Sequence, residues 1–144
     1  MLFNRFLTRA ERRRIAEAIA VAESATTGEI HVHLAALPPP REILAQARWL
    51  FPRLGLDKTQ ARNGVLILIS PEDKRFAIWG DEGIHAEAGQ PLWEKAQALL
   101  SQGLAKSPAD AIVAAVAAVG EALALHFPVD GPRRNELSDD VSES

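Results

Sequence analysis

Apolar residues recur at helical spacing in four segments of the chain. The first opens with Thr8-Arg-Ala-Glu11, a capping box in which hydroxyl and carboxylate satisfy each other's backbone N–H groups. Ile15 and Ile19 then continue an apolar stripe. The pattern predicts helices over residues 8–24, 40–51, 90–103 and 107–128, with Pro40 in the first turn of the second, Pro52 and Gly55 closing it, and Ser107 capping the fourth.

Three further segments have the pattern of strands. Residues 29–34 alternate strictly, with Ile30, Val32 and Leu34 on one face and Glu29, His31 and His33 on the other. Residues 65–69 are apolar at every position, which is typical of a central strand covered on both faces. Residues 75–80 follow a short turn that contains Pro71.

The connections between these strands fix the topology. A strand–helix–strand unit requires a parallel pair with a right-handed crossover, and the short turn requires an antiparallel hairpin. The sequence therefore predicts an α/β fold, a three-layer domain with a small mixed sheet between helices and strand 65–69 in the middle. Residues 1–128 are expected to form this single domain. Residues 129–144 are expected to be an acidic tail that lies on the surface or is disordered.

Composition narrows the class of function. The chain has 144 residues, of which 47% are hydrophobic and 24% charged, as in one globular domain. Its net charge of −3 argues against a nucleic-acid partner. The absence of cysteine excludes disulfides, cysteine-ligated zinc and a cysteine nucleophile. The longest uncharged apolar run, residues 111–120, is too short for a membrane span and no secretory signal is evident, so we expect a cytoplasmic location.

Charge is distributed unevenly along the chain. Basic residues crowd the start (Arg5, Arg9, Arg12, Arg13, Arg14), and acidic residues mark the end (Glu136, Asp139, Asp140, Glu143). Such blocks commonly do no more than solvate a surface. Surfaces of opposite sign also suit the steering of a partner, or pairing with one another.

The predicted topology brings three loops to one edge of the sheet, namely residues 26–29, 57–63 and 80–83. This edge collects Glu29, Asn63, Asp81 and Glu82, whose oxygens are the hard ligands that Ca²⁺ or Mg²⁺ requires. It also holds Arg62, which can bind a phosphate oxygen. The sequence indicates a weak divalent-cation or anion site here, and the alternative is ordinary loop chemistry, because these residue types are common turn formers.

Other candidate sites are weaker. His31 and His33 project from one strand face, but a zinc site needs further ligands, which would have to come from Glu29, His85 or His126. We therefore predict no structural zinc at this pair. Phosphate-loop, nucleophile-elbow and dinucleotide motifs are absent, so no organic cofactor is expected. The three tryptophans have the spacing of packing residues.

Three segments resemble the TPM domain family. They are residues 27–32 (Thr-Gly-Glu-Ile-His-Val), residues 54–67, and residues 76–85 (Phe-Ala-Ile-Trp-Gly-Asp-Glu-Gly-Ile-His), and the resemblance covers about residues 11–128. It implies a mixed sheet between helices, with divalent metal in the loops of some members. The family includes a plant thylakoid-lumen acid phosphatase, photosystem-repair proteins and a receptor-modulating animal protein. For a metal-assisted phosphatase, the resemblance would make Asp81 and Glu82 metal ligands.

The residues favour a binding module over a fast enzyme. No nucleophile is identifiable, and His85 is the nearest candidate to protonate a leaving group. We therefore expect a partner-binding domain with a weak Ca²⁺ site, whose protein partner the sequence does not identify. A phosphatase-like hydrolase of phosphomonoesters is the alternative.

Overall fold

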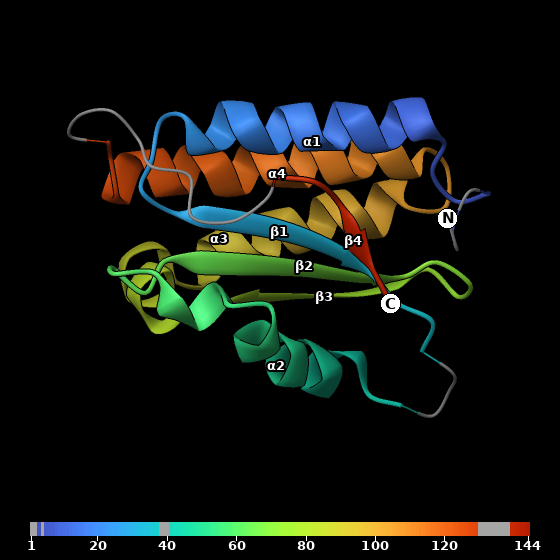
Figure 1. Ribbon diagram of the computed structural model, residues 1–144, viewed down its shortest axis with the longest axis horizontal. Helices are drawn as coiled ribbons and strands as arrows, with labels where there is room; N and C mark the ends of the chain where they lie inside the picture. The colour runs from blue at the N-terminus through green and yellow to red at the C-terminus, as the bar shows by residue number, and fades with distance from the viewer. Residues whose placement is uncertain (1–2, 4, 38–40, 130–138) are drawn as a thin grey trace.

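The computed structural model describes residues 3, 5–37, 41–129 and 139–144 (Figure 1). Its helices are α1 (Arg9–Glu23), α2 (Ile43–Arg53), the short 3₁₀ helix η1 (Leu56–Lys58), α3 (Glu82–Gly103) and α4 (Pro108–His126). Its strands are β1 (Glu29–Leu34), β2 (Gly64–Ser70), β3 (Arg75–Gly80) and β4 (Ser142–Glu143). The three prolines at residues 38–40, among them Pro40 at the predicted start of the second helix, lie outside the described residues.

The described strands form one mixed sheet in the order β3-β2-β1-β4. β1 pairs in parallel with β2, from Glu29 opposite Gly64 to Leu34 opposite Ile69. β2 pairs antiparallel with β3, with Val65 opposite Gly80. Every residue of β2 is buried. The predicted position of this strand between the other two is thus confirmed.

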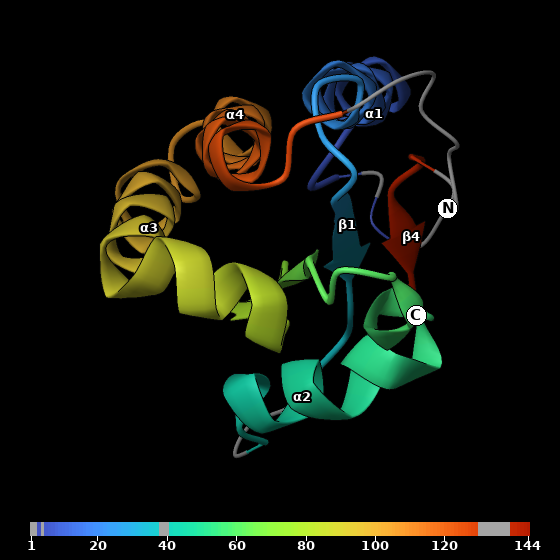
Figure 2. The same cartoon turned by 90° about the vertical axis from the view of Figure 1, so that its left-hand side faces the viewer.

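Helices cover both faces of the sheet, as predicted. Figure 2 shows α1, α3 and α4 on one side of the strands and α2 on the other. Successive residues of β2 point to opposite faces, so Val65, Ile67 and Ile69 join the larger core cluster with α1, α3 and α4. Leu66 and Leu68 join a smaller one with α2. The α/β three-layer class is confirmed.

Local signals explain how α1 begins and how it packs. The capping box is present: the Glu11 backbone N–H donates to Thr8 Oγ1 at 3.1 Å, and the Thr8 N–H donates to Glu11 Oε1 at 2.8 Å. Further along, α1 lies against α4 at very close range. A Cβ added to Gly120 would lie 2.6 Å from the Ala22 Cβ, so glycine is required for this approach.

α3 begins eight residues before the start expected at Gln90. Asp81 is its N-cap and accepts from the Glu82 N–H at 2.8 Å, so residues 80–83 lead into a helix instead of forming a turn. Gly89 interrupts the helix with a φ of 66°. This interruption and Pro91 divide the apolar pattern, which explains why only the second half was predicted. α2 begins at Ile43 and contains Pro52 instead of ending before it.

Part of the expected tail belongs to the sheet. Residues 130–138 lie outside the described part, but Ser142 and Glu143 form β4, parallel to β1. The Ser144 N–H donates to Leu34 O at 2.9 Å, and Val141 is buried in the larger core cluster. A surface-lying or disordered tail therefore does not describe residues 139–144. The outer edge of β1 offers backbone partners that the sequence pattern alone does not reveal.

Among the described residues, one helix, α4, is long and apolar enough to cross a membrane. Half of the most apolar stretch of this helix is buried inside the fold, where α4 packs against α1 and α3. Core helices commonly have the same length and composition.

Candidate functional site

The backbone of the predicted edge converges as expected. Glu29 lies opposite Gly64 at the start of the parallel pair, and its N–H donates to Asn63 O at 3.4 Å. The Asp81 N–H donates to Gly64 O at 3.0 Å. The three loops are therefore neighbours at one end of the sheet, and the directions of their side chains decide what they can do.

Arg62 and Asp81 form the polar centre of this end. Arg62 Nε lies 2.6 Å from Asp81 Oδ2, and Nη2 lies 2.9 Å from Asp81 Oδ1, a bidentate ion pair. The Arg62 backbone has a φ of 53°, and its carbonyl accepts from the N–H groups of Gly83 and Ile84 at the start of α3. A Cβ on Gly83 would lie 2.1 Å from Ala61 O. Glycine there lets the loop dock onto the helix.

Three carboxylates surround the Arg62 guanidinium. Asp81 is bonded to it, Glu82 Oε1 lies 3.5 Å from Nη1, and Asp57 also attracts it. The hydrogen bonds that Arg62 donates to Asp81 raise the pKa of Arg62. Asp57 belongs to the predicted edge loop but not to the four expected ligands, and its Oδ1 is buried without a hydrogen-bond partner. The cluster therefore already contains a cation, the Arg62 guanidinium. A divalent ion would have to displace it or bind the same carboxylates beside it.

The other two predicted ligands point elsewhere. Asn63 is buried, and its side-chain Nδ2 donates to Thr27 Oγ1 at 3.0 Å, while its Oδ1 is buried without a partner. Glu29 is also buried, and its carboxyl group interacts with Glu23. Glu29 and Asn63 thus have other partners than Asp81 and Glu82, which both pair with Arg62. In the described part of the chain, no three His, Asp or Glu side chains are grouped as for a metal ion.

Glu23 marks a second acidic cluster, which the sequence did not predict. Its Oε2 accepts from the Ile30 N–H at 2.8 Å at the outer edge of β1. Burial, followed by a side-chain hydrogen bond with Asp139, raises the pKa of Glu23 to about 10. Glu23 and Asp139 lie at opposite ends of the chain, so no local spacing could reveal this contact.

A cleft of about 700 Å³ opens beside the Arg62 cluster, between α2 and α3. We call it the α2–α3 cleft. Its walls combine aromatic, basic and acidic side chains, notably Phe51, Trp79, Trp93, Arg48, Arg62, Asp57, Asp81, Glu82 and His85. Trp79 and Trp93 also pack on the two cores, as predicted for the tryptophans. Trp49, in contrast, is 51% exposed and stacks on Arg53 outside the cleft.

His85 has a defined orientation in this cleft. Trp93 Nε1–H donates to His85 Nδ1 at 2.9 Å, and the two rings are stacked with centroids 6.3 Å apart. Neutral His85 therefore carries its proton on Nε2, where it can donate. A Cβ on Gly80 would lie 2.3 Å from the Trp93 ring, so glycine allows this tryptophan to cover the end of β3.

His31 and His33 face the C-terminal residues. His31 Nε2 and His33 Nδ1 lie 2.5 and 2.7 Å from Ser142 Oγ, and His33 Nε2 lies 2.7 Å from Ser144 Oγ. Burial lowers the pKa of His31, and burial with the neighbouring His31 lowers that of His33 to about 4. Both histidines therefore bond to serine hydroxyls of the C-terminal residues. The absence of structural zinc remains a prediction.

Comparison with known proteins places this chain in a family. The TPM domain model matches residues 3–122. The NMR structure of the BA42 protein from the psychrophilic bacterium Bizionia argentinensis is 34% identical, with a TM-score of 0.85 over 96% of each chain. The N-terminal domain of the cg2496 protein from Corynebacterium glutamicum, 13% identical, shares the fold, with a TM-score of 0.69 over 93% of this chain and 84% of that one. The curated proteins gave no significant match. On the strength of the family match, the chain belongs to the TPM domain family.

Proposed function

We propose that this chain is a protein-binding module and that an extended segment of its partner binds in the α2–α3 cleft. The observation that carries this proposal is the position of the cleft. It lies beside β3, which has β2 as its sole neighbour among the described strands. An outer strand presents backbone donors and acceptors to which another strand can pair.

The walls of the cleft suit such a segment. Phe51, Trp79 and Trp93 supply apolar area, and aromatic side chains dominate the energetics of protein interfaces. Arg48 adds a positive charge from α2 that takes part in no ion pair among the described residues, whereas the Arg62 cluster has three carboxylates around one guanidinium and is net acidic. We therefore expect the bound segment to carry an apolar residue and an acidic one.

A pair of matched variants tests this proposal. Trp93→Ala with Arg48→Glu removes one aromatic and one basic group from the cleft, and Trp49→Ala with Arg53→Glu removes the same groups from the outer face of α2. Protein captured from the native cell by the wild type should be retained by the second variant and reduced roughly tenfold or more by the first. Equal capture by both variants would exclude the cleft as the binding surface.

A weak divalent-cation site belongs to the same proposal. No three acidic side chains of the described residues are grouped for a metal ion, so such a site would be weak: Asp81 and Glu82 would bind Ca²⁺ or Mg²⁺ in competition with Arg62. Chemical shifts should move in these loops at millimolar Ca²⁺, and Arg62→Gln should tighten binding because it removes the competing charge. Asp81→Asn should weaken it. If Ca²⁺ affects none of these residues in either protein, there is no such site.

A phosphomonoesterase is the second candidate function. It is favoured by one observation: His85 and Arg62 line the same cleft as the carboxylates. Arg62 could hold a phosphate oxygen, and His85 Nε2–H could donate a hydrogen bond to the leaving-group oxygen; a bound cation would activate water. Turnover of an aryl phosphate, with and without Ca²⁺ or Mg²⁺, tests it. A rate near the ~10 s⁻¹ median of enzymes, lost in folded His85→Ala, would favour this candidate over the binding module.

A further inference from the structure

The opposite edge of the sheet is occupied by the chain itself. Residues 139–144, here called the C-terminal segment, run along the outer edge of β1. Backbone pairing is short: Ser142 and Glu143 lie opposite His33 and Leu34, and the Ala36 N–H donates to Ser144 O at 3.3 Å. Most of the contacts that hold this segment therefore come from side chains.

Two serines of the segment bind the two histidines of β1. Ser142 Oγ lies between His31 Nε2 and His33 Nδ1, and Ser144 Oγ lies at His33 Nε2. His31 Nδ1 is buried without a partner, and an unpaired acceptor costs less than an unpaired N–H. The preferred arrangement is thus a chain of donors from His31 Nε2 to Ser142, from Ser142 to His33, and from His33 to Ser144. The Ser142 hydroxyl thus accepts from His31 and donates to His33, and the Ser144 hydroxyl accepts from His33.

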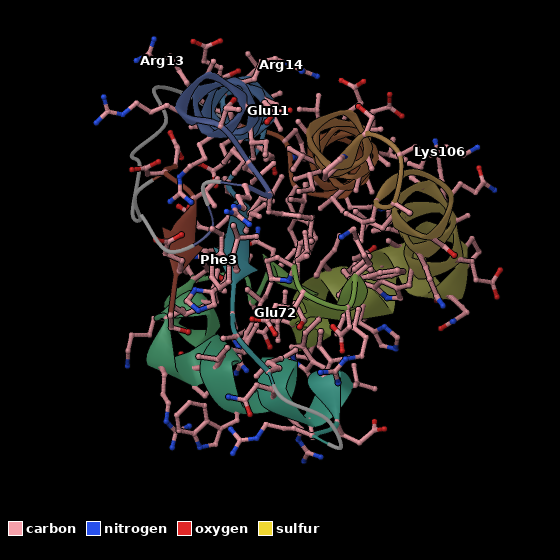
Figure 3. All side chains as sticks on the ribbon, turned by 90° about the vertical axis from the view of Figure 1, so that its right-hand side faces the viewer. Phe3, Glu11, Arg13, Arg14, Glu72 and Lys106 are labelled. Atoms are coloured by element: carbon pink, nitrogen blue, oxygen red, sulfur yellow. The ribbon has the colours of Figure 1, made fainter. Side chains whose placement is uncertain are left out.

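Val141 and Glu143, which alternate with the two serines, have sites of their own. Glu143 Oε2 lies 3.0 Å from Arg12 Nη1, an ion pair whose side chains are 17% and 12% exposed. Arg12 Nη2 also donates to Val141 O at 2.9 Å. The Val141 side chain is buried in the larger core cluster. Arg12 is therefore turned toward the segment, whereas Figure 3 shows Arg13 and Arg14 on the outer side of α1.

We infer that the outer edge of β1 is a binding site for extended peptides with an apolar, a hydroxyl, an acidic and a hydroxyl residue in succession. Residues 141–144 of this chain are its resident ligand. This edge is held in place by the rest of the fold, because β1 pairs with β2 on its other side and α1 packs on α4. A partner strand of the same pattern can replace the segment by β-augmentation. This site is independent of the α2–α3 cleft.

Competition in the full-length chain tests the inference. Val141→Asp with Glu143→Lys releases the segment by placing charges at the core and against Arg12. A blocked peptide with the sequence of residues 139–144, Asp-Asp-Val-Ser-Glu-Ser, is then titrated while the amide signals of His33, Leu34 and Ala36 are followed. The peptide should saturate the variant and return these signals to their wild-type positions. The wild type should bind it more weakly, since a tethered segment competes at an effective concentration on the order of millimolar.

Charge exchange provides the matched control. A peptide with lysine in place of Glu143 should bind the released variant roughly tenfold more weakly or worse. Arg12→Glu combined with Val141→Asp, with Glu143 kept so that the segment is still repelled, should reverse the preference. If the double variant does not fold, Glu143→Lys alone gives the same comparison. A folded variant that shows no change at millimolar peptide, or that binds both peptides equally, would overturn the inference.

Discussion

The buried carboxyl of Glu23 makes the stability of this protein depend on pH. Glu23 is 2% exposed at the end of α1, and its pKa is raised from 4.5 to about 10, first by burial and then by its hydrogen bond with Asp139. In the unfolded chain it ionises near its ordinary value. Between these two pKa values, the native state keeps a proton that the unfolded state has released.

The sign and size of the effect follow from linkage. Because the native pKa is raised, the stabilisation from this group is complete below the unfolded pKa and is lost as pH rises toward the native value. The free energy of unfolding falls by up to about 1.4 kcal/mol per pH unit. From about pH 5.5 to about pH 7.5 the loss reaches about 3 kcal/mol. Glu23→Gln is neutral in both states, so the variant should gain up to this amount over the wild type across that interval.

Urea unfolding followed by tryptophan fluorescence measures this difference. Groups that do not interact with Glu23 titrate alike in both proteins, so their contributions cancel when the two pH profiles are subtracted; Asp139 and Glu29 interact with it and belong to the measured difference. Glu17→Gln, at an exposed position of the same helix, is the control and should leave the profile unchanged. Parallel profiles for Glu23→Gln and the wild type would refute the reasoning, because they would show that Glu23 ionises in the native state.

Three further predictions concern packing, capping and histidine charge. Ile67→Ala truncates a fully buried side chain of the central strand and should lower the free energy of unfolding in urea by about 2–5 kcal/mol. The control, Val21→Ala at a 72% exposed position, should lower it by less than about 0.5 kcal/mol. Thr8→Ala removes the capping box and should lower the unfolding free energy by about 1 kcal/mol; no change would mean that the cap is dispensable. The lowered pKa of His33, about 4, means that its contribution to stability is present above its unfolded value of 6.5 and is lost as pH falls. Its ring signals should titrate near pH 4 together with the amide signals of β4, and titration near the unfolded value would contradict its burial.

The fold was largely predictable because its signals are local. The alternation of residues 29–34, the apolar run in β2 and the capping box at Thr8 each depend on neighbours in sequence. β4 was missed for the opposite reason. Its two residues carry no strand pattern, and they pair with β1 only because the first and last parts of the chain meet.

The candidate site was predictable in its backbone and not in its side chains. Strand polarity brought Glu29, Asn63 and Asp81 to one end of the sheet, as topology requires. Where each carboxyl points depends on distant partners, such as Glu23 for Glu29 and Arg62 for Asp81. An alternating pattern predicts which face of a strand a residue occupies, but it does not predict which side chain contacts that residue.

The packing of α1 on α4 affects how the protein is made. A domain is synthesised from its N-terminus at ~5–20 residues per second, and α1 emerges from the ribosome well before the helix it packs against (Figure 1). Its apolar stripe therefore stays without its main partner for a time on the order of ten seconds. Ile15 and Ile19, which are fully buried in the folded protein, are exposed during that interval. A nascent-chain chaperone that binds apolar side chains would find both of them exposed, after Leu7.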